Sequence, residues 1–123
     1  MDSHESSRYD PVAELVKINP VPSMIMDMQT LSVAVVNQAA VGLLGYTEKE
    51  LLGKRITDLV PAEDIQAVMQ ANIEPVPEGE TEWRSQTRGG KTIYLKLKYR
   101  DTSYRGKAAR FIVVLESSPA PFK

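Results

Sequence analysis

The last third of the chain alternates between apolar and polar side chains. In residues 93–100 the odd positions carry Ile, Leu, Leu and Tyr, and the even positions carry Tyr, Lys, Lys and Arg. This two-residue period predicts a strand with one buried and one solvated face. Residues 82–88 alternate in the same way, and Gly89-Gly90 predicts a tight turn between the two strands. Residues 110–115 are apolar on both faces after Arg110, which predicts a central or covered strand.

The first third combines a helical pattern with two short β-prone runs. Asp10 and Pro11 predict the N-cap and first position of an amphipathic helix over residues 11–18. Two prolines within the next four residues end this helix, because proline lacks the donor that a helix needs. Residues 23–27 and 31–36 then predict a β-hairpin.

The middle of the chain carries the start and stop signals of short helices. Asn37 predicts the cap of a helix that Gly45 closes in a left-handed conformation. Thr47 and Glu50 have the spacing of a capping box, and Gly53 follows as the terminator of the second helix. Both glycines are therefore expected at positive φ.

A third helix is expected to start at Ala62, with Ile65, Val68 and Met69 on one face. Two strands, three short helices and three long strands then follow one another along the chain. This order predicts an α+β fold in which a five-stranded antiparallel sheet carries short helices on one face, preceded by the N-terminal amphipathic helix.

Composition narrows the function classes. The 123 residues suit one domain, and 15 Lys and Arg are interspersed with 16 Asp and Glu, which argues against nucleic acid contact. The chain has no cysteine, so disulfides and thiolate metal sites are excluded. No apolar run approaches the roughly 20 residues that span a bilayer, and the polar first ten residues lack a signal peptide pattern. We therefore expect a cytoplasmic protein without membrane contact.

Several blocks of sequence resemble the landmarks of the PAS domain family. They are Asn19-Pro20-Val21-Pro22, Met24-Ile25-Met26-Asp27, the block from Val36 to Gly53, Pro61-Ala62-Glu63-Asp64, Trp83-Arg84, Arg88-Gly89-Gly90-Lys91 and Arg105-Gly106-Lys107. The resemblance implies a PAS-like fold in which sheet and helical lid enclose a small cavity. It divides the chain into a tail and capping helix at 1–18, a PAS domain at 19–116 and a linker at 117–123.

The resemblance also implies a sensory role in signal transduction. PAS domains commonly pair through the outer sheet face and the preceding helix. They regulate an output such as a histidine kinase, a cyclic-dinucleotide enzyme or a DNA-binding region. The alternative is a ligand-free interaction and dimerisation module.

Missing side chains exclude several cofactors of that family. Light-oxygen-voltage flavin adducts and hydroxycinnamate chromophores both require a cysteine. Haem-binding members require an axial histidine on the helix expected near residues 63–72, and the single histidine is His4 in the tail. No cofactor is therefore expected, although noncovalent flavin stays open, and a small organic molecule in an apolar cavity is the ligand hypothesis.

The expected cavity wall combines apolar side chains of the predicted core with two aromatic residues whose polar atoms need partners. Its members are Met26, Val36, Ala40, Leu44, Tyr46, Ile56, Leu59, Met69, Trp83, Leu95, Leu97 and Val113. Plain core packing is the alternative role for these residues.

A homodimer interface is expected on the opposite side. Val12, Leu15 and Val16 form an apolar stripe on the first helix, and Ile112 and Val114 are placed on the outer face of the last strand. The alternative is that the helix folds back on its own sheet.

Enzymatic activity is not expected. The predicted domain has neither cysteine nor histidine to act as nucleophile or base. Asp27, the acidic residue within an apolar strand, is the candidate for acid or base chemistry, and no motif accompanies it.

Overall fold

The computed structural model describes residues 10–73 and 76–123. Its five strands are β1 (Ser23–Asp27), β2 (Val33–Val36), β3 (Glu78–Gln86), β4 (Thr92–Tyr104) and β5 (Lys107–Ser118). Its helices are α2 (Pro11–Ile18), α3 (Gln38–Leu44), α4 (Glu48–Leu51) and α5 (Ile65–Ala71), with the short 3₁₀ helices η1 (Ile56–Leu59) and η2 (Ala62–Asp64). Residues 1–9 of the predicted tail lie outside the described part.

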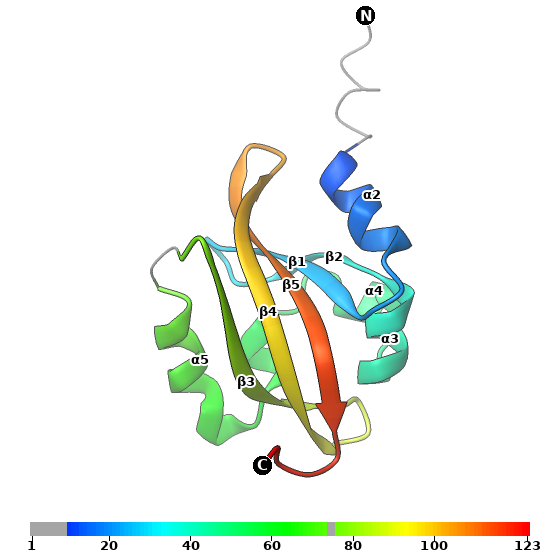
Figure 1. The fold of residues 1–123 in the computed structure, drawn as a ribbon, viewed down its shortest axis with the longest axis vertical. Helices are drawn as coiled ribbons and strands as arrows, with labels where there is room; N and C mark the ends of the chain where they lie inside the picture. Colours follow the sequence, from blue (N-terminus) through cyan, green and yellow to red (C-terminus); the bar gives the residue numbers. More distant parts are fainter. Residues whose placement is uncertain (1–9, 74–75) are drawn as a thin grey trace, which may run out of the picture.

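The strands form an antiparallel sheet in the order β2-β1-β5-β4-β3 (Figure 1). The last strand of the chain therefore lies at the centre, between β1 and β4. Gly90, at φ 87°, lies in the turn between β3 and β4, and Gly106, at φ 78°, lies in the turn between β4 and β5. The predicted α+β architecture is confirmed.

The two faces of the sheet carry different helices. Met24 and Met26 of β1 pack with the residues of α3, α4 and η1 in the larger core cluster. Ile25, which points the other way, packs with Val16 of α2 in a second cluster. The helices α3 to α5 thus cover one face, called the inner face below, while α2 lies against the outer face.

Local capping explains why such short helices form where they do. The Asn37 side chain accepts a hydrogen bond from the Ala40 amide at 3.0 Å, and Gly45 ends α3 at φ 81°. Thr47 and Glu50 form the predicted capping box at the start of α4. The Gly53 backbone also has a positive φ, of 88°, so the expectation for both glycines is confirmed.

Helix α2 has the predicted bounds, with Asp10 as its N-cap, and one side of it packs on its own sheet. Val16 is fully buried against Ile25, Val35 and Ala109 of its own sheet, so it is not a free interface residue as the sequence suggested. Only one side of α2 packs against the sheet, and the predicted apolar stripe extends beyond that side. Leu15 remains 62% exposed.

Within the two described ranges, none of the helices combines the length and the apolar character that crossing a bilayer requires.

Candidate functional site

A cavity of about 110 Å³ lies between the inner face of the sheet and its helices. Its wall contains these residues of the predicted set: Met26, Ala40, Leu44, Ile56, Leu59, Trp83, Leu95 and Leu97. The remaining wall includes Pro22, Ser23, Met24, Leu43, Val60, Val68, Ala71, Asn72, Thr81, Arg84, Ser85, Tyr99, Arg110, Ile112 and Val114. The site is therefore mostly apolar, with its charged groups on β3 and β5.

The last strand presents the opposite face from the one expected. Ile112 and Val114, predicted for the dimer interface, line the cavity, and Val113, predicted for the cavity, lies outside with Phe111. Both faces of this strand are apolar, so the alternation that identifies a buried face is missing. Arg110 has the same parity as Ile112 and lies in the cavity wall.

Met69 is also misplaced by the sequence argument, because it is 50% exposed and does not line the cavity. Val68 and Ala71 of α5 and its C-cap residue Asn72 line the cavity instead. Consecutive helical residues differ by about 100° in direction, and this step places Met69 on the exposed side of the buried Val68. The polar residue Asn72 therefore lines the cavity where the sequence indicated Met69.

Val36 and Tyr46 belong to the core and not to the cavity wall. Val36 is completely buried within the inner cluster, and the half-buried Tyr46 packs against that cluster. The Lys54 ammonium lies 5.1 Å from the centre of the Tyr46 ring. For these two residues the alternative of plain packing holds.

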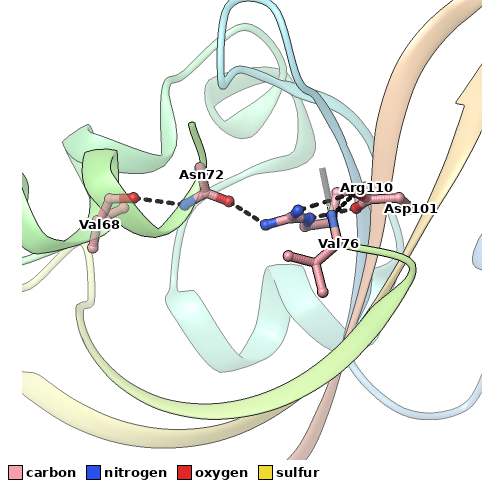
Figure 2. A network of polar contacts seen from close by, with 5 residues as sticks. All are labelled: Val68, Asn72, Val76, Asp101 and Arg110. Carbon is pink, nitrogen blue, oxygen red and sulfur yellow. Dashed lines mark hydrogen bonds and ion pairs between the residues drawn. The ribbon is translucent and has the colours of Figure 1, made fainter. Parts of the chain in front are cut away.

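A buried polar network connects Asn72, Asp101 and Arg110 (Figure 2), and two of these residues, Asn72 and Arg110, line the cavity. Arg110, only 3% exposed, donates from Nε to Asp101 Oδ1 at 2.6 Å and from Nη2 to Asp101 Oδ2 at 3.1 Å. Its Nη1 donates to Asn72 Oδ1 at 2.7 Å, and Asn72 Nδ2 donates to the Val68 carbonyl at 2.7 Å. The Val76 amide donates to Asp101 Oδ2 at 2.7 Å. The network ties the end of α5 to the centre of the sheet.

Aromatic stacking and charge hold this network in place. The Arg110 guanidinium lies 4.6 Å from the centre of the Tyr99 ring. Across the strands, Gly79 leaves room for that ring, since a Cβ there would lie 2.6 Å from Tyr99 Oη. Burial would raise the pKa of Asp101, but hydrogen bonds from Arg110 and the Val76 amide, with the Arg110 charge, lower it below its usual value.

A second ion pair joins the helices to strand β3 at the sheet edge. Arg84 donates from Nε and Nη2 to the two carboxylate oxygens of Asp64 at 2.9 and 2.7 Å, and Glu63 lies 3.3 Å away. The hydrogen bond from Arg84 lowers the pKa of Asp64, and the same bond raises that of Arg84. The sequence predicted a helix that starts at Ala62, and it gave no indication of this ion pair.

The sequence did hold a signal for the first network. Arg110 begins the apolar run of residues 110–115, and a charged residue in a buried strand needs a partner. Alternation along residues 93–100 does not indicate that Asp101, the next position, is that partner. The two residues face each other directly in the pairing of β4 with β5.

Other candidates from the sequence have structural surroundings. Asp27 Oδ1 accepts the backbone amides of Gln29 and Thr30 at 2.7 and 3.1 Å, which closes the turn after β1. His4 lies outside the described residues. In residues 10–73 and 76–123, no three His, Cys, Asp or Glu side chains come together as metal ligands would.

Comparison with known proteins agrees with this architecture. The profile described as "PAS domain" matches residues 20–116, while no curated protein matches the chain. A solved PAS domain of an HTR-like protein from Haloarcula marismortui is 22% identical, with a TM-score of 0.68 over 94% of this chain and 93% of that chain.

Two further solved structures show the same fold. A PAS domain from a two-component sensor histidine kinase is 12% identical, with a TM-score of 0.69 over 95% of this chain and 100% of that chain. The LOV protein of Rhodobacter sphaeroides is 17% identical, with a TM-score of 0.72 over 94% of this chain and 68% of that chain.

Proposed function

Because the chain belongs to the PAS domain family, we propose that it is a sensory module that binds a small organic molecule noncovalently in the inner cavity. Ligand binding would regulate an output domain through a homodimer. The output is a kinase, a cyclic-dinucleotide enzyme or a DNA-binding region, and the module acts in the cytoplasm without contacting nucleic acid or membrane itself. It signals and does not catalyse a reaction.

The cavity between the sheet and its helices is the observation that carries this proposal. Protein interiors are normally filled, and voids larger than a water molecule are few. Here about 110 Å³ stays open between sheet and helices, and most of its wall is apolar. The buried network of Arg110 and Asn72 in this wall adds the few polar groups that ligand sites use to fix orientation.

The size of the cavity limits the ligand. Pockets for drug-sized ligands occupy about 300–1,000 Å³, and the three-ring system of a flavin is too large for 110 Å³. An engineered cavity of about 150 Å³ holds benzene, so a ligand of about six non-hydrogen atoms is the right scale. Noncovalent flavin therefore does not fit this cavity.

Mass spectrometry of small molecules released from purified, denatured protein tests the proposal. We expect an organic compound of this size in stoichiometric amount, and a preparation that does not absorb beyond the aromatic band. A yellow or red preparation would contradict the colourless ligand.

The same measurement separates this proposal from the alternative, a ligand-free interaction module. That module predicts no released compound. It also predicts no change in the fluorescence of Trp83, the single tryptophan, when molecules of this size are added.

A further inference from the structure

We infer that the cavity selects an electrically neutral molecule carrying a hydrogen-bond acceptor, such as a ketone, and that the Arg110 guanidinium anchors this acceptor. The inference rests on the proposed ligand-binding function and narrows its ligand class. It follows from the unused donors of Arg110 and from the balance of charges around the cavity.

Arg110 has more hydrogen-bond donors than its described protein partners use. A guanidinium carries five N–H donors, and bonds to Asp101 and Asn72 occupy three of them among the described residues. The residue lines the cavity and is almost completely buried, so water has little access to the remaining two. A buried donor without an acceptor is costly, and an acceptor supplied by a ligand removes that cost.

The charges around the cavity are already paired. The charged residues in its wall are Arg84 and Arg110, and each forms a two-point ion pair, with Asp64 and Asp101 respectively. An anionic ligand would lose its water without meeting an unpaired cation, and that desolvation is expensive. The pairing therefore favours a neutral acceptor over a carboxylate or a phosphate.

The remaining wall fits the apolar body of such a ligand. Leu95, Leu97 and Ile112 lie on the same face of the sheet as Arg110, and Tyr99 fixes the guanidinium by stacking on it. A ligand that places its acceptor at Arg110 can thus bury its hydrocarbon part against neighbouring strands. This arrangement matches a compact ring with one carbonyl group.

Three probes of similar size test the inference: cyclohexane, cyclohexanone and cyclopentanecarboxylate. Binding is measured by NMR titration of backbone amides and by Trp83 fluorescence. Cyclohexane reports on the apolar cavity alone, cyclohexanone adds a neutral acceptor, and the carboxylate adds a charge. In the wild-type protein the ketone should bind more tightly than the carboxylate.

A double variant removes the anchor without leaving a lone charge. Asp101→Leu with Arg110→Met replaces the ion pair by apolar groups, a change that proteins often tolerate. Loss of a hydrogen bond to a charged group should weaken cyclohexanone about tenfold or more, and cyclohexane binding should persist. Circular dichroism and thermal unfolding check that the variant is folded.

Asn72→Ala provides a second comparison that keeps the ion pair. It frees the Nη1 donor of Arg110 that Asn72 now occupies. The affinity for cyclohexanone relative to cyclohexane should therefore rise, and taking the ratio cancels the effect of a slightly larger cavity. If the double variant does not fold, the ratio of the two affinities in Asn72→Ala is the deciding measurement. A ratio equal to that of the wild type overturns the inference.

The outcomes separate this inference from the proposed function. If cyclohexane binds and the double substitution does not change the affinity for cyclohexanone, Arg110 is not the anchor of the acceptor. The proposed ligand-sensing function would then still stand. Tighter binding of the carboxylate than of the ketone would overturn the neutral ligand class. Failure of all three probes to bind would overturn this inference, and a preparation that also releases no compound in mass spectrometry would overturn the proposed function as well.

Discussion

Asn37 is buried where three segments meet, and both ends of its side chain are used. Its Oδ1 accepts the backbone amides of Ser23 and Ala40 at 3.1 and 3.0 Å. Its Nδ2 lies near three carbonyl oxygens between α2 and β1, those of Val16, Asn19 and Val21, at 3.0, 3.0 and 2.8 Å. One amide therefore caps α3 and also fastens the end of α2 to the sheet.

The substitution Asn37→Asp tests this double role. Aspartate keeps the acceptor that caps α3, but it places a second oxygen against the three carbonyls, where only a donor is satisfied. We expect a loss of about 3 kcal/mol or more in the free energy of unfolding, measured by urea denaturation. Gln66→Glu, the same chemical change at an exposed position of α5, is the control and should be nearly neutral. Equal midpoints for the two variants would show that Asn37 acts as a simple helix cap.

Local sequence signals predicted that Asn37 caps α3, but they did not predict that its side chain also binds the carbonyls between α2 and β1. Asn before an apolar run indicates an N-cap because its partner is three residues away. The carbonyls that Nδ2 contacts lie 16 to 21 residues upstream, and the Arg84 pair with Asp64 spans 20 residues. Contacts at such separations depend on how the elements pack, and a single sequence does not contain that information.

At the scale of elements, helix ends were more predictable than strand faces. Helix α2 and the cap residues of α3 and α4 were placed correctly because proline, glycine and side-chain caps act within a few residues. The cavity-facing side of β5 was not, because residues 111–115 are all apolar. A bulge between Lys96 and Leu97 further shifts the register with β5.

The glycine that ends α3 gives a prediction with a control in the same helix. Gly45 has φ 81°, and a Cβ there would meet Arg88 atoms only at 3.8 Å, so Gly45→Ala costs backbone strain without a clash. We expect it to destabilise by about 1 kcal/mol. Gly42 has ordinary helical geometry and open space around it, so Gly42→Ala should stabilise by about 0.5–1 kcal/mol. Thermal unfolding that shifts both variants in the same direction would refute the assignment.

At the scale of the whole molecule, the outer sheet face is only partly covered. Helix α2 covers the β1 and β2 side, and Phe111 and Val113 lie farther along with the charged residues of β3 and β4. Phe111 and Val113, and not Ile112 and Val114, are therefore the β5 residues on the face where the dimer interface is expected. Leu15 and the 73% exposed Ile18, one helical turn apart, extend the apolar surface along α2.

Homodimerisation through this surface is best tested at Leu15. Because Leu15 is already exposed in the single chain, an aspartate there costs little in the monomer, but dimerisation would have to bury its charge. Light scattering should therefore give twice the chain mass for the wild type and the single chain mass for Leu15→Asp. Met69→Asp makes the same change at a half-exposed position on α5, on the opposite side of the sheet, and should remain dimeric. A monomeric wild type, or a Leu15→Asp variant that stays dimeric, would rule out this interface.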